Sequence, residues 1–226
     1  MQVRFHLIKL LANLYIKKVT GIENFPINEG YILLTNHNSA ADFFCSALPL
    51  GIYSKAQIKF KRNLPINKRT SVIVRFVLSR KKAYFNLVYK VLFSFCRLFF
   101  EPITIFKDGA MEKCVESLNK GQCLIIFPEG LLNEDRKQLL KAKTGAARLA
   151  LSTKVKVIPA GIINSERILP PQHSVIPRFH RMTVNIGEPI DLSSYYAKKD
   201  DPETIQHVTR MMMKRLGELC NKEYLY

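Results

Sequence analysis

The chain has 226 residues, of which 47% are apolar, and this length and composition are typical of one folded domain and exclude a disordered chain. Lys and Arg number 35 against 18 Asp and Glu, which gives a formal net charge of +17 at pH 7. A charge excess of this size indicates an anionic partner, either a nucleic acid or an anionic membrane surface.

The N-terminal segment over residues 1–18 is predicted to form an amphipathic helix, because its polar residues recur every three or four positions with leucines between them. These polar residues are Gln2, His6, Lys9, Asn13 and Lys17. They interrupt the apolar sequence, so we expect no cleaved signal peptide there. No uncharged apolar run in the sequence reaches about 18 residues, the length that a transmembrane helix needs.

A second amphipathic helix is predicted over Phe85–Phe100, and the positive charge is concentrated around it. Residues 51–107 carry 13 basic side chains and a single acid, Glu101. The strongly apolar face of this helix is compatible with core packing and also with a helix that lies in a membrane surface. The basic run Arg80–Lys82 just before it favours the membrane, because cations there would contact lipid phosphates.

The other segments alternate between strand and helix. The predicted strands are Tyr31–Thr35, Pro102–Phe106, Cys123–Phe127, Val155–Ile163 and Met182–Ile186, and the predicted helices are Asp42–Leu50, Ala110–Asn119, Thr144–Thr153 and one that begins at Pro202 after the N-cap Asp201. This alternation predicts an α/β fold with a mostly parallel central sheet flanked by helices. We expect a single domain over residues 1–226, with the N-terminal helix followed by a core over 19–190 and a helical segment over 191–226. The five cysteines are scattered without CxxC spacing, which favours a reduced, intracellular setting.

The first candidate for chemistry is the pair His37 and Asp42, which follows the strand that ends at Thr35. A chain that turns from strand into helix can bring the aspartate back beside the imidazole. The carboxylate would then accept the Nδ1–H and leave Nε2 free as a base, as in the His–Asp half of a catalytic triad. Ser39 and Asp42 also fit a capping box, in which Asp42 bonds to the N-cap amide, and the two interpretations are compatible. The histidines have no spacing typical of metal ligands, so we expect no metal.

The second candidate is Glu129, which with Gly130 follows the predicted strand over Cys123–Phe127. Ligands of open α/β sheets bind at the C-terminal ends of the strands, so this carboxylate is well placed to orient a substrate; an exposed glutamate in a turn would give the same pattern. Further along, Lys141, Lys143 and Gly145 lie where a helix begins. Two lysines and free helix N–H groups would suit a phosphate, although an ordinary solvated loop is the alternative.

These segments, taken in order, resemble the motifs of the PlsC-type glycerolipid acyltransferases, the 1-acylglycerol-3-phosphate acyltransferase family. The quoted motifs are His37 with Asp42, Phe127–Gly130 and Val157–Ala160. Further similarity lies in Val19–Pro26, Lys143–Arg148 and Gly187–Ile190, so that the likeness runs from about residue 19 to residue 190. Any one motif is weakly specific, whereas the ordered set is highly specific.

The resemblance implies transfer of a fatty acyl group from acyl-CoA or an acyl carrier protein to a lysophospholipid hydroxyl, most simply 1-acylglycerol-3-phosphate to give phosphatidate. It implies that His37 is the base and Asp42 its orienting partner. It also assigns Glu129 and Gly130 to the acceptor site, Pro159 to the pocket wall and Lys107 to the acceptor's phosphate. No cofactor is implied beyond the acyl donor, and the expected partner surface is an anionic membrane, with the enzyme peripheral on its cytoplasmic side and no nucleic acid bound.

Two departures from the family pattern concern the acceptor. The family usually has Arg where this chain has Lys107, and it continues the Phe-Pro-Glu-Gly motif with Thr-Arg-Ser where this chain has Leu131–Asn133. Lysine keeps the charge and loses the bidentate geometry of arginine, and Arg136, Lys141 or Lys143 would have to replace the missing Arg. An acyltransferase for another lysolipid is therefore the alternative within the class. A non-catalytic basic protein that binds membrane or nucleic acid is the alternative outside it.

Overall fold

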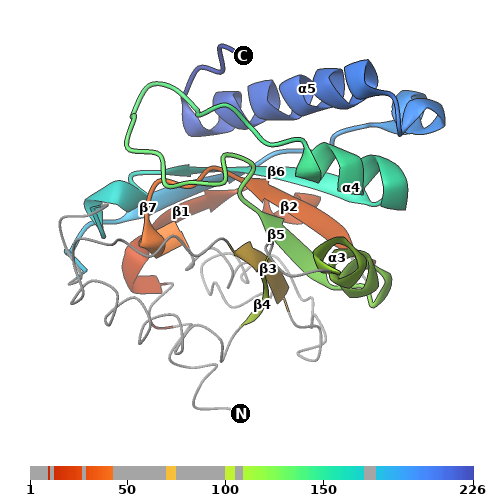
Figure 1. Cartoon of the computed structure of the whole chain (residues 1–226). Helices are drawn as coiled ribbons and strands as arrows, with labels where there is room; N and C mark the ends of the chain where they lie inside the picture. The colour runs from red at the N-terminus through yellow and green to blue at the C-terminus, as the bar shows by residue number, and fades with distance from the viewer. Residues whose placement is uncertain are drawn as a thin grey trace.

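The structure is a computed structural model built around one seven-stranded sheet (Figure 1). The strands are β1 (Ile16–Thr20), β2 (Tyr31–Thr35), β3 (Thr70–Val74), β4 (Phe100–Thr104), β5 (Cys123–Ile126), β6 (Lys156–Ile163) and β7 (Met182–Ile186). The structure describes residues 10, 13–26, 29–42, 70–74, 100–104, 109–170 and 177–226. For β3 and β4 it describes the backbone only.

The strand order in the sheet is β1-β7-β6-β2-β5-β3-β4. Five neighbouring strands, from β6 to β4, run parallel to one another, while β7 pairs antiparallel with β6 and carries β1 parallel to itself. The central strand β2 is buried along its whole length, as expected for a parallel strand covered on both faces. The prediction of an α/β fold with a mostly parallel sheet is confirmed.

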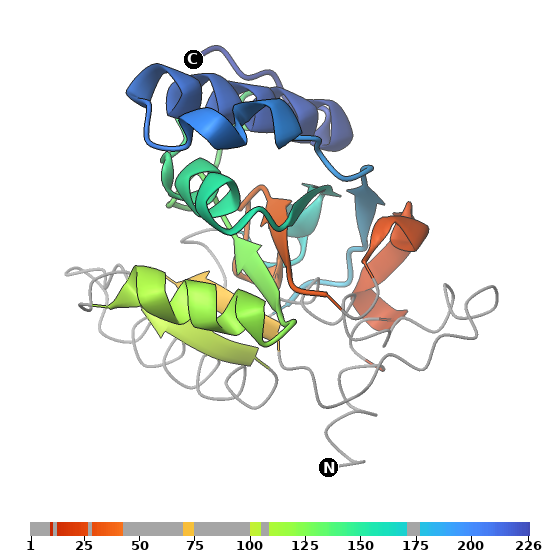
Figure 2. The ribbon, with the colours of Figure 1, turned by 90° about the vertical axis from the view of Figure 1, so that its right-hand side faces the viewer.

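Three helices cover one face of this sheet: α3 (Ala110–Asn119), α4 (Gly145–Thr153) and α5 (Pro202–Cys220). Figure 2 shows them side by side in one layer, with α4 between α3 and α5. Short 3-10 turns lie at Ile22–Asn24, Ser165–Arg167 and Ser193–Lys198. Asp201 caps α5 by accepting the Thr204 N–H at 2.8 Å, and proline occupies the first turn, which is the chemistry that predicts a helix start there.

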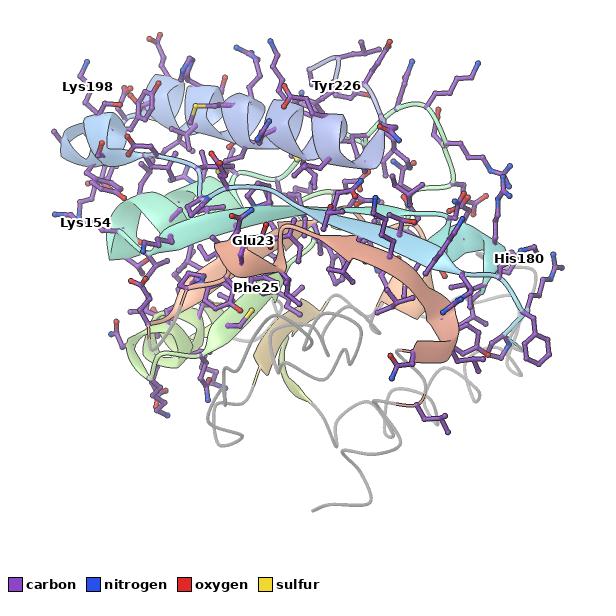
Figure 3. All side chains as sticks on the ribbon, turned by 180° about the vertical axis from the view of Figure 1, so that it is seen from behind. Glu23, Phe25, Lys154, His180, Lys198 and Tyr226 are labelled. Carbon is purple, nitrogen blue, oxygen red and sulfur yellow. The ribbon has the colours of Figure 1, made fainter. Side chains whose placement is uncertain are left out.

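The alternation of side chains along the strands divides the core between the two faces. Ile32 and Leu34 of β2 pack on the helical face with the buried stripe of α5. Leu33 packs on the opposite face with Phe25 and Ile162. Figure 3, seen from behind, labels Phe25 on this second face and Lys154 at the end of α4. Each fully buried aliphatic side chain contributes about 1.5–3 kcal/mol, so both faces stabilise the sheet that positions the site.

The structure differs from the predicted elements mainly at the N-terminal side. Leu10 and residues 13–15 are helical, but residues 16–18, expected to end the helix, begin β1. The reason is tertiary: Ile16 is fully buried and pairs with Met182 of β7. Strand β3 was not predicted, and β4 begins two residues earlier than expected. The predicted helices over 42–50 and 85–100 lie outside the described residues, apart from Asp42 and from Phe100, which begins β4.

Candidate active site

The topology brings the two candidate motifs to the same edge of the sheet. Strands β2 and β5 are parallel neighbours in register, with Leu34 opposite Ile126. His37 and Glu129 each follow their strand by a few residues, and the carboxyl ends of parallel strands form the usual ligand site of such sheets. The His37 backbone N–H donates to Glu129 Oε1 at 3.1 Å, so the two motifs, 92 residues apart, are in direct contact.

Asp42 turns back onto the His37 ring. Its Oδ2 lies 2.9 Å from His37 Nδ1 and also accepts the backbone N–H groups of Asn38 at 2.8 Å and Ser39 at 2.9 Å. Residues 40–42 form a 3-10 turn, so the bond from Ser39 to Asp42 is the capping contact and the bond to His37 is the triad-like contact. The Asp42 carboxylate therefore makes both the capping contact and the triad-like contact that the spacing predicts.

The surroundings of His37 define its tautomer. Because Asp42 is fully buried and acts as an acceptor, the proton of a neutral imidazole lies on Nδ1, and Nε2 keeps its lone pair. The ring stacks on Phe127, with centroids 4.1 Å apart, and its side chain is 25% exposed. A ring held on one nitrogen, supported on one face and partly open to solvent can take a proton at Nε2 from a bound group.

Glu129 and Asn133 hold the His37 peptide from both sides. Glu129 Oε1 accepts the His37 N–H, and the Asn133 backbone N–H donates to the His37 carbonyl at 2.7 Å. The second oxygen, Glu129 Oε2, accepts the Asn133 side-chain amide at 2.7 Å and the Leu140 backbone N–H at 2.8 Å. The two oxygens of Glu129 are thus engaged with the protein itself, and the side chain is buried.

Burial and hydrogen bonding act on Glu129 in opposite directions. Desolvation raises its pKa, while the donors Leu140, His37 and Asn133 and the charge of Lys222 lower it; burial is the larger effect, so the pKa is raised above 4.5. Every hydrogen-bond partner described for this carboxylate is a donor. Protonation of Glu129 would place an O–H group against one of these N–H donors, with no acceptor between them. The ionised carboxylate therefore fits the contacts best.

Asparagine side chains, whose roles the sequence did not indicate, anchor the His37 loop to β6. The Asn36 amide donates to the Ile162 carbonyl at 2.9 Å and accepts the Ile162 N–H at 2.7 Å, which continues the sheet pairing with a side chain. Ser39 Oγ donates to the Leu169 carbonyl at 2.7 Å. In the sequence, Asn36 is marked only by its position directly after a buried strand. This signal is weak, because asparagine is also common in turns.

The structure describes all of the other predicted binding residues except Lys107. Gly130 has φ +71°, a left-handed conformation that favours glycine, and the backbone N–H of Lys143 donates to the Pro128 carbonyl at 2.8 Å. Lys141, Lys143 and Gly145 are exposed at the start of α4. Pro159 is buried in β6 opposite Leu34, and its carbonyl accepts the Gly187 N–H at 2.8 Å. Lys107 lies outside the described residues.

Comparison with known proteins locates the chain in a family. The acyltransferase family model matches residues 17–163, more than half of the chain, and includes both motifs of the site. The crystal structure of the 1-acyl-sn-glycerophosphate (LPA) acyltransferase PlsC from Thermotoga maritima superposes with a TM-score of 0.61, covering 96% of this chain and 81% of that one. Its sequence identity is 21%, so this similarity concerns the fold.

Two curated relatives are similar over shorter stretches. Tafazzin of Drosophila melanogaster is 30% identical over 115 residues, which cover 49% of this chain and 30% of that protein. The chloroplastic 1-acyl-sn-glycerol-3-phosphate acyltransferase LPAT1 of Arabidopsis thaliana is 32% identical over 80 residues, 35% of this chain and 22% of that protein. The matches therefore span less than a third of either relative. The family model matches more than half of the chain and the fold agrees with it, so the chain belongs to the acyltransferase family.

Proposed function

We propose that this acyltransferase moves a fatty acyl group from a thioester donor to the hydroxyl of a lysophospholipid, with 1-acylglycerol-3-phosphate as acceptor and phosphatidate as product. The observation that carries the proposal is the 2.9 Å contact between His37 Nδ1 and the buried Asp42 carboxylate. This contact leaves Nε2 as the free basic atom of a ring that is partly exposed.

The proposed reaction uses one proton shuttle and no covalent enzyme intermediate. His37 Nε2 removes the proton of the acceptor hydroxyl while its oxygen attacks the thioester carbonyl. Asp42 stabilises the imidazolium that forms, and the tetrahedral intermediate collapses with cleavage of the carbon–sulfur bond. The departing thiolate takes the proton back from Nε2, so the free thiol and the new ester are the products. No cofactor enters this scheme apart from the donor, acyl-CoA or an acyl carrier protein.

In this proposal Glu129 is a positioning residue rather than a ligand of the acceptor. Its oxygens are occupied by His37, Asn133 and Leu140, and the side chain is buried. It therefore acts on the reaction through the backbone of His37. Gly130, which follows it, has the left-handed backbone conformation that favours glycine.

The acceptor's phosphate needs cations, because an unpaired charge in a partly dry pocket is costly. Lys141 and Lys143 precede α4, whose N-terminal N–H groups favour anions, and Lys107 occupies the position that the family pattern gives to Arg. We propose these lysines, with Gly145 at the start of α4, as the phosphate site. An acyltransferase for another lysolipid is the second candidate, favoured by Leu131–Asn133 in place of the usual Thr-Arg-Ser.

A peripheral position on the cytoplasmic side of an anionic membrane completes the proposal. Among the described helices, none is long and apolar enough to cross a membrane. The basic segment over 51–107 lies mostly outside the described residues. Phe179 is 88% exposed between basic neighbours and precedes β7, whose start pairs with the end of β6. Phe179 therefore lies at the same edge of the sheet as His37. A membrane in contact with Phe179 would bring its lipids close to His37.

The deciding experiment measures acyl transfer by the purified protein from labelled acyl-CoA and from acyl carrier protein to a panel of lysolipids, with products identified by mass. The proposal expects 1-acylglycerol-3-phosphate as the best acceptor and phosphatidate as the product. Lys107→Ala should raise the KM for this acceptor by about 10- to 100-fold, the cost of one charged hydrogen bond, and leave the donor KM unchanged.

The same panel separates the two candidates. A phosphate-free lysolipid should be a poor acceptor, and its kinetics should not respond to Lys107→Ala. Equal use of that lipid, together with unchanged acceptor kinetics in Lys107→Ala, would favour the other-lysolipid candidate. Absence of acyl transfer to every lysolipid from both donors would contradict the proposed reaction itself.

A further inference from the structure

Lys222 follows α5 and reaches the candidate active site from a distant part of the chain. Asn221 ends α5 in the left-handed conformation, with φ 58°, and the Lys222 N–H donates back to the Gly217 carbonyl at 3.0 Å. The Lys222 side chain that follows this turn is half-buried and contacts the loops after β2 and β5. Its Nζ donates to Asn38 Oδ1 at 2.8 Å and to the Asp135 carbonyl.

The residues next to Lys222 pair with the same loop. The Glu223 N–H donates to the Lys137 carbonyl and the Leu139 N–H donates to the Glu223 carbonyl, both at 2.8 Å. Tyr224 Oη accepts the Ala142 N–H at 3.3 Å. Figure 1 shows the loop between β5 and α4 beside the C-terminal end of α5, where these bonds form. We call Lys222–Tyr224 the clasp.

The two loops that Lys222 joins are those that build the site. Asn38 is adjacent to His37, and its backbone N–H donates to Asp42. The loop over 133–142 holds Glu129 through Asn133 and Leu140, and Asn133 also holds the His37 carbonyl. One ammonium group therefore connects the peptide after His37 with the loop that fixes Glu129.

We propose that Lys222 is a positioning residue of acyl transfer, which holds the His37 loop and the loop after Glu129 in their relative places. The inference rests on the proposed function for its kinetic consequence, while its structural consequence is independent of the substrate. Lys222 contacts Asn38 across 184 residues of sequence, and none of the motifs contains it. Its effect on the reaction passes through Asn38, Asp42 and Glu129.

The charge of Lys222 adds a consequence that hydrogen bonding alone does not have. It lowers the pKa of Glu129 against the effect of burial. Titratable side chains close to Glu129 or Lys222 include His37, with its partner Asp42, and Cys220, whose thiol stays neutral because burial raises its pKa to about 12. They also include Asp135, whose pKa is lowered by the backbone N–H groups of Lys137 and Gln138 and by the charge of Lys222. Loss of the ammonium charge should therefore shift protonation of Glu129 to higher pH, while replacement by another cation should not.

The test compares three variants of the full chain: Lys222→Met, Lys222→Arg and the control Lys214→Met, an exposed lysine of α5. With the best lysolipid acceptor, Lys222→Met should lower kcat by about tenfold or more, because small displacements of catalytic groups are costly, and change both KM values less than twofold. The acid limb of its kcat profile should move to higher pH. Lys222→Arg should restore the acid limb and most of kcat, and Lys214→Met should match the wild type.

A second readout does not depend on activity. The carboxyl carbon of Glu129, labelled with 13C and assigned from Glu129→Gln, should titrate at higher pH in Lys222→Met than in the wild type and in Lys222→Arg. Lys222→Gln replaces Lys222→Met if the latter does not fold. An unchanged Glu129 titration, or kcat and pH profiles like those of Lys214→Met, would overturn the inference. A wild type without acyl transfer would contradict the proposed function, while the titration would still decide the role of Lys222.

Discussion

At the scale of single residues, the site depends on carboxylates that receive several donors each. Asp42 Oδ2 accepts His37 Nδ1 and two backbone N–H groups, and Glu129 accepts from His37, Asn133 and Leu140. Charge-assisted bonds of this kind are about twice as strong as neutral ones. His37 is consequently held at its ring by one carboxylate and at its backbone by the other, which limits its freedom without occupying Nε2.

The first prediction concerns the proposed base. His37→Ala should lower kcat by about 100-fold or more, because general-base assistance contributes at least that much. Asp42→Asn should also lower kcat, since the neutral amide does not stabilise the imidazolium. Steady-state kinetics with circular dichroism as a check of folding provide the measurement. A folded His37→Ala protein with nearly normal turnover would exclude His37 as the base.

The second prediction concerns the pH dependence of stability through Glu129. Burial raises its pKa above 4.5 in the folded state, so between 4.5 and the folded-state pKa the folded protein binds more protons than the unfolded chain. The contribution of Glu129 to the free energy of unfolding is therefore fully present below pH 4.5 and decreases as pH rises through the raised pKa. The free energy of unfolding of the wild type minus that of Glu129→Gln should therefore decrease between pH 4.5 and the folded-state pKa of Glu129.

Urea unfolding of both proteins between pH 4 and pH 7.5 measures this difference. Glu188→Gln, which removes an exposed carboxylate, is the matched control with which the pH dependence of the Glu129→Gln difference is compared. A difference for Glu129→Gln that stays constant or grows with pH would show that the hydrogen-bond donors, and not burial, dominate at this carboxylate.

At the scale of elements, α5 approaches β6 so closely that only glycine fits between them. A Cβ on Gly161 would lie 2.3 Å from the Leu219 carbonyl carbon and 2.5 Å from the Cys220 nitrogen. This close contact places the end of α5, and the clasp that follows it, beside the edge of the sheet where β6 and β2 end. The short distance between helix end and strand thus positions Lys222 for its contact with Asn38.

The third prediction tests this approach. Gly161→Ala should lower the free energy of unfolding by about 1–3 kcal/mol, because backbone atoms have to move to admit the methyl group. Gly145→Ala is the control, since nothing lies within 4 Å of a Cβ there; it should be neutral or slightly stabilising. Chemical denaturation measures both. Equal stabilities of the two variants would contradict the close packing of α5 on β6.

At the scale of the whole molecule, the helices cover one face of the sheet, and the candidate active site lies at one edge of the sheet. Helices α3, α4 and α5 cover one face, whereas the loops after β2 and β5 and the segment before β7 meet at one edge. Arg181 in that segment donates to the Asn13 and Ile16 carbonyls, which ties the end of the N-terminal helical turn to the same edge. Leu10 and Leu14 of that turn are exposed.

The fourth prediction concerns docking on anionic lipid. Replacing Arg80, Lys81 and Lys82 with Ser should weaken binding to vesicles rich in phosphatidylserine by about 100-fold at low salt, since each basic residue near the surface contributes about 1 kcal/mol. Binding of the wild type should weaken with salt, because screening acts beyond the Debye length. Sedimentation with vesicles measures both effects.

A control removes the same number of charges elsewhere. Lys198, Lys199 and Lys214 are exposed in the helical layer, and Figure 3 labels Lys198 there. Their joint replacement with Ser should affect vesicle binding less than the loss of Arg80–Lys82. Equal losses would attribute docking to net charge alone, and binding indifferent to salt and lipid charge would contradict an electrostatic surface.

The sequence by itself determined the α/β class, the ends of several elements and the grouping of His37 with Asp42. Helix α3 and strand β7 have the predicted bounds, and α5 begins after its predicted cap. These features depend on local chemistry: apolar periodicity, capping residues and turn spacing act within a few residues. The contact of Asp42 with His37 is local in the same sense, because five residues separate the two.

Only the tertiary structure decided the features that depend on distant pairing. The strand character of residues 16–18 comes from β7, about 165 residues away, and no local pattern distinguishes it from a helix end. The hydrogen bonds of Glu129 to His37, Asn133 and Leu140 depend in the same way on packing, because these residues come from separate segments of the chain. The clasp could not be predicted at all, because Lys222 meets Asn38 through the docking of α5 on the sheet, and side-chain contacts across such separations are set by packing rather than by spacing along the chain.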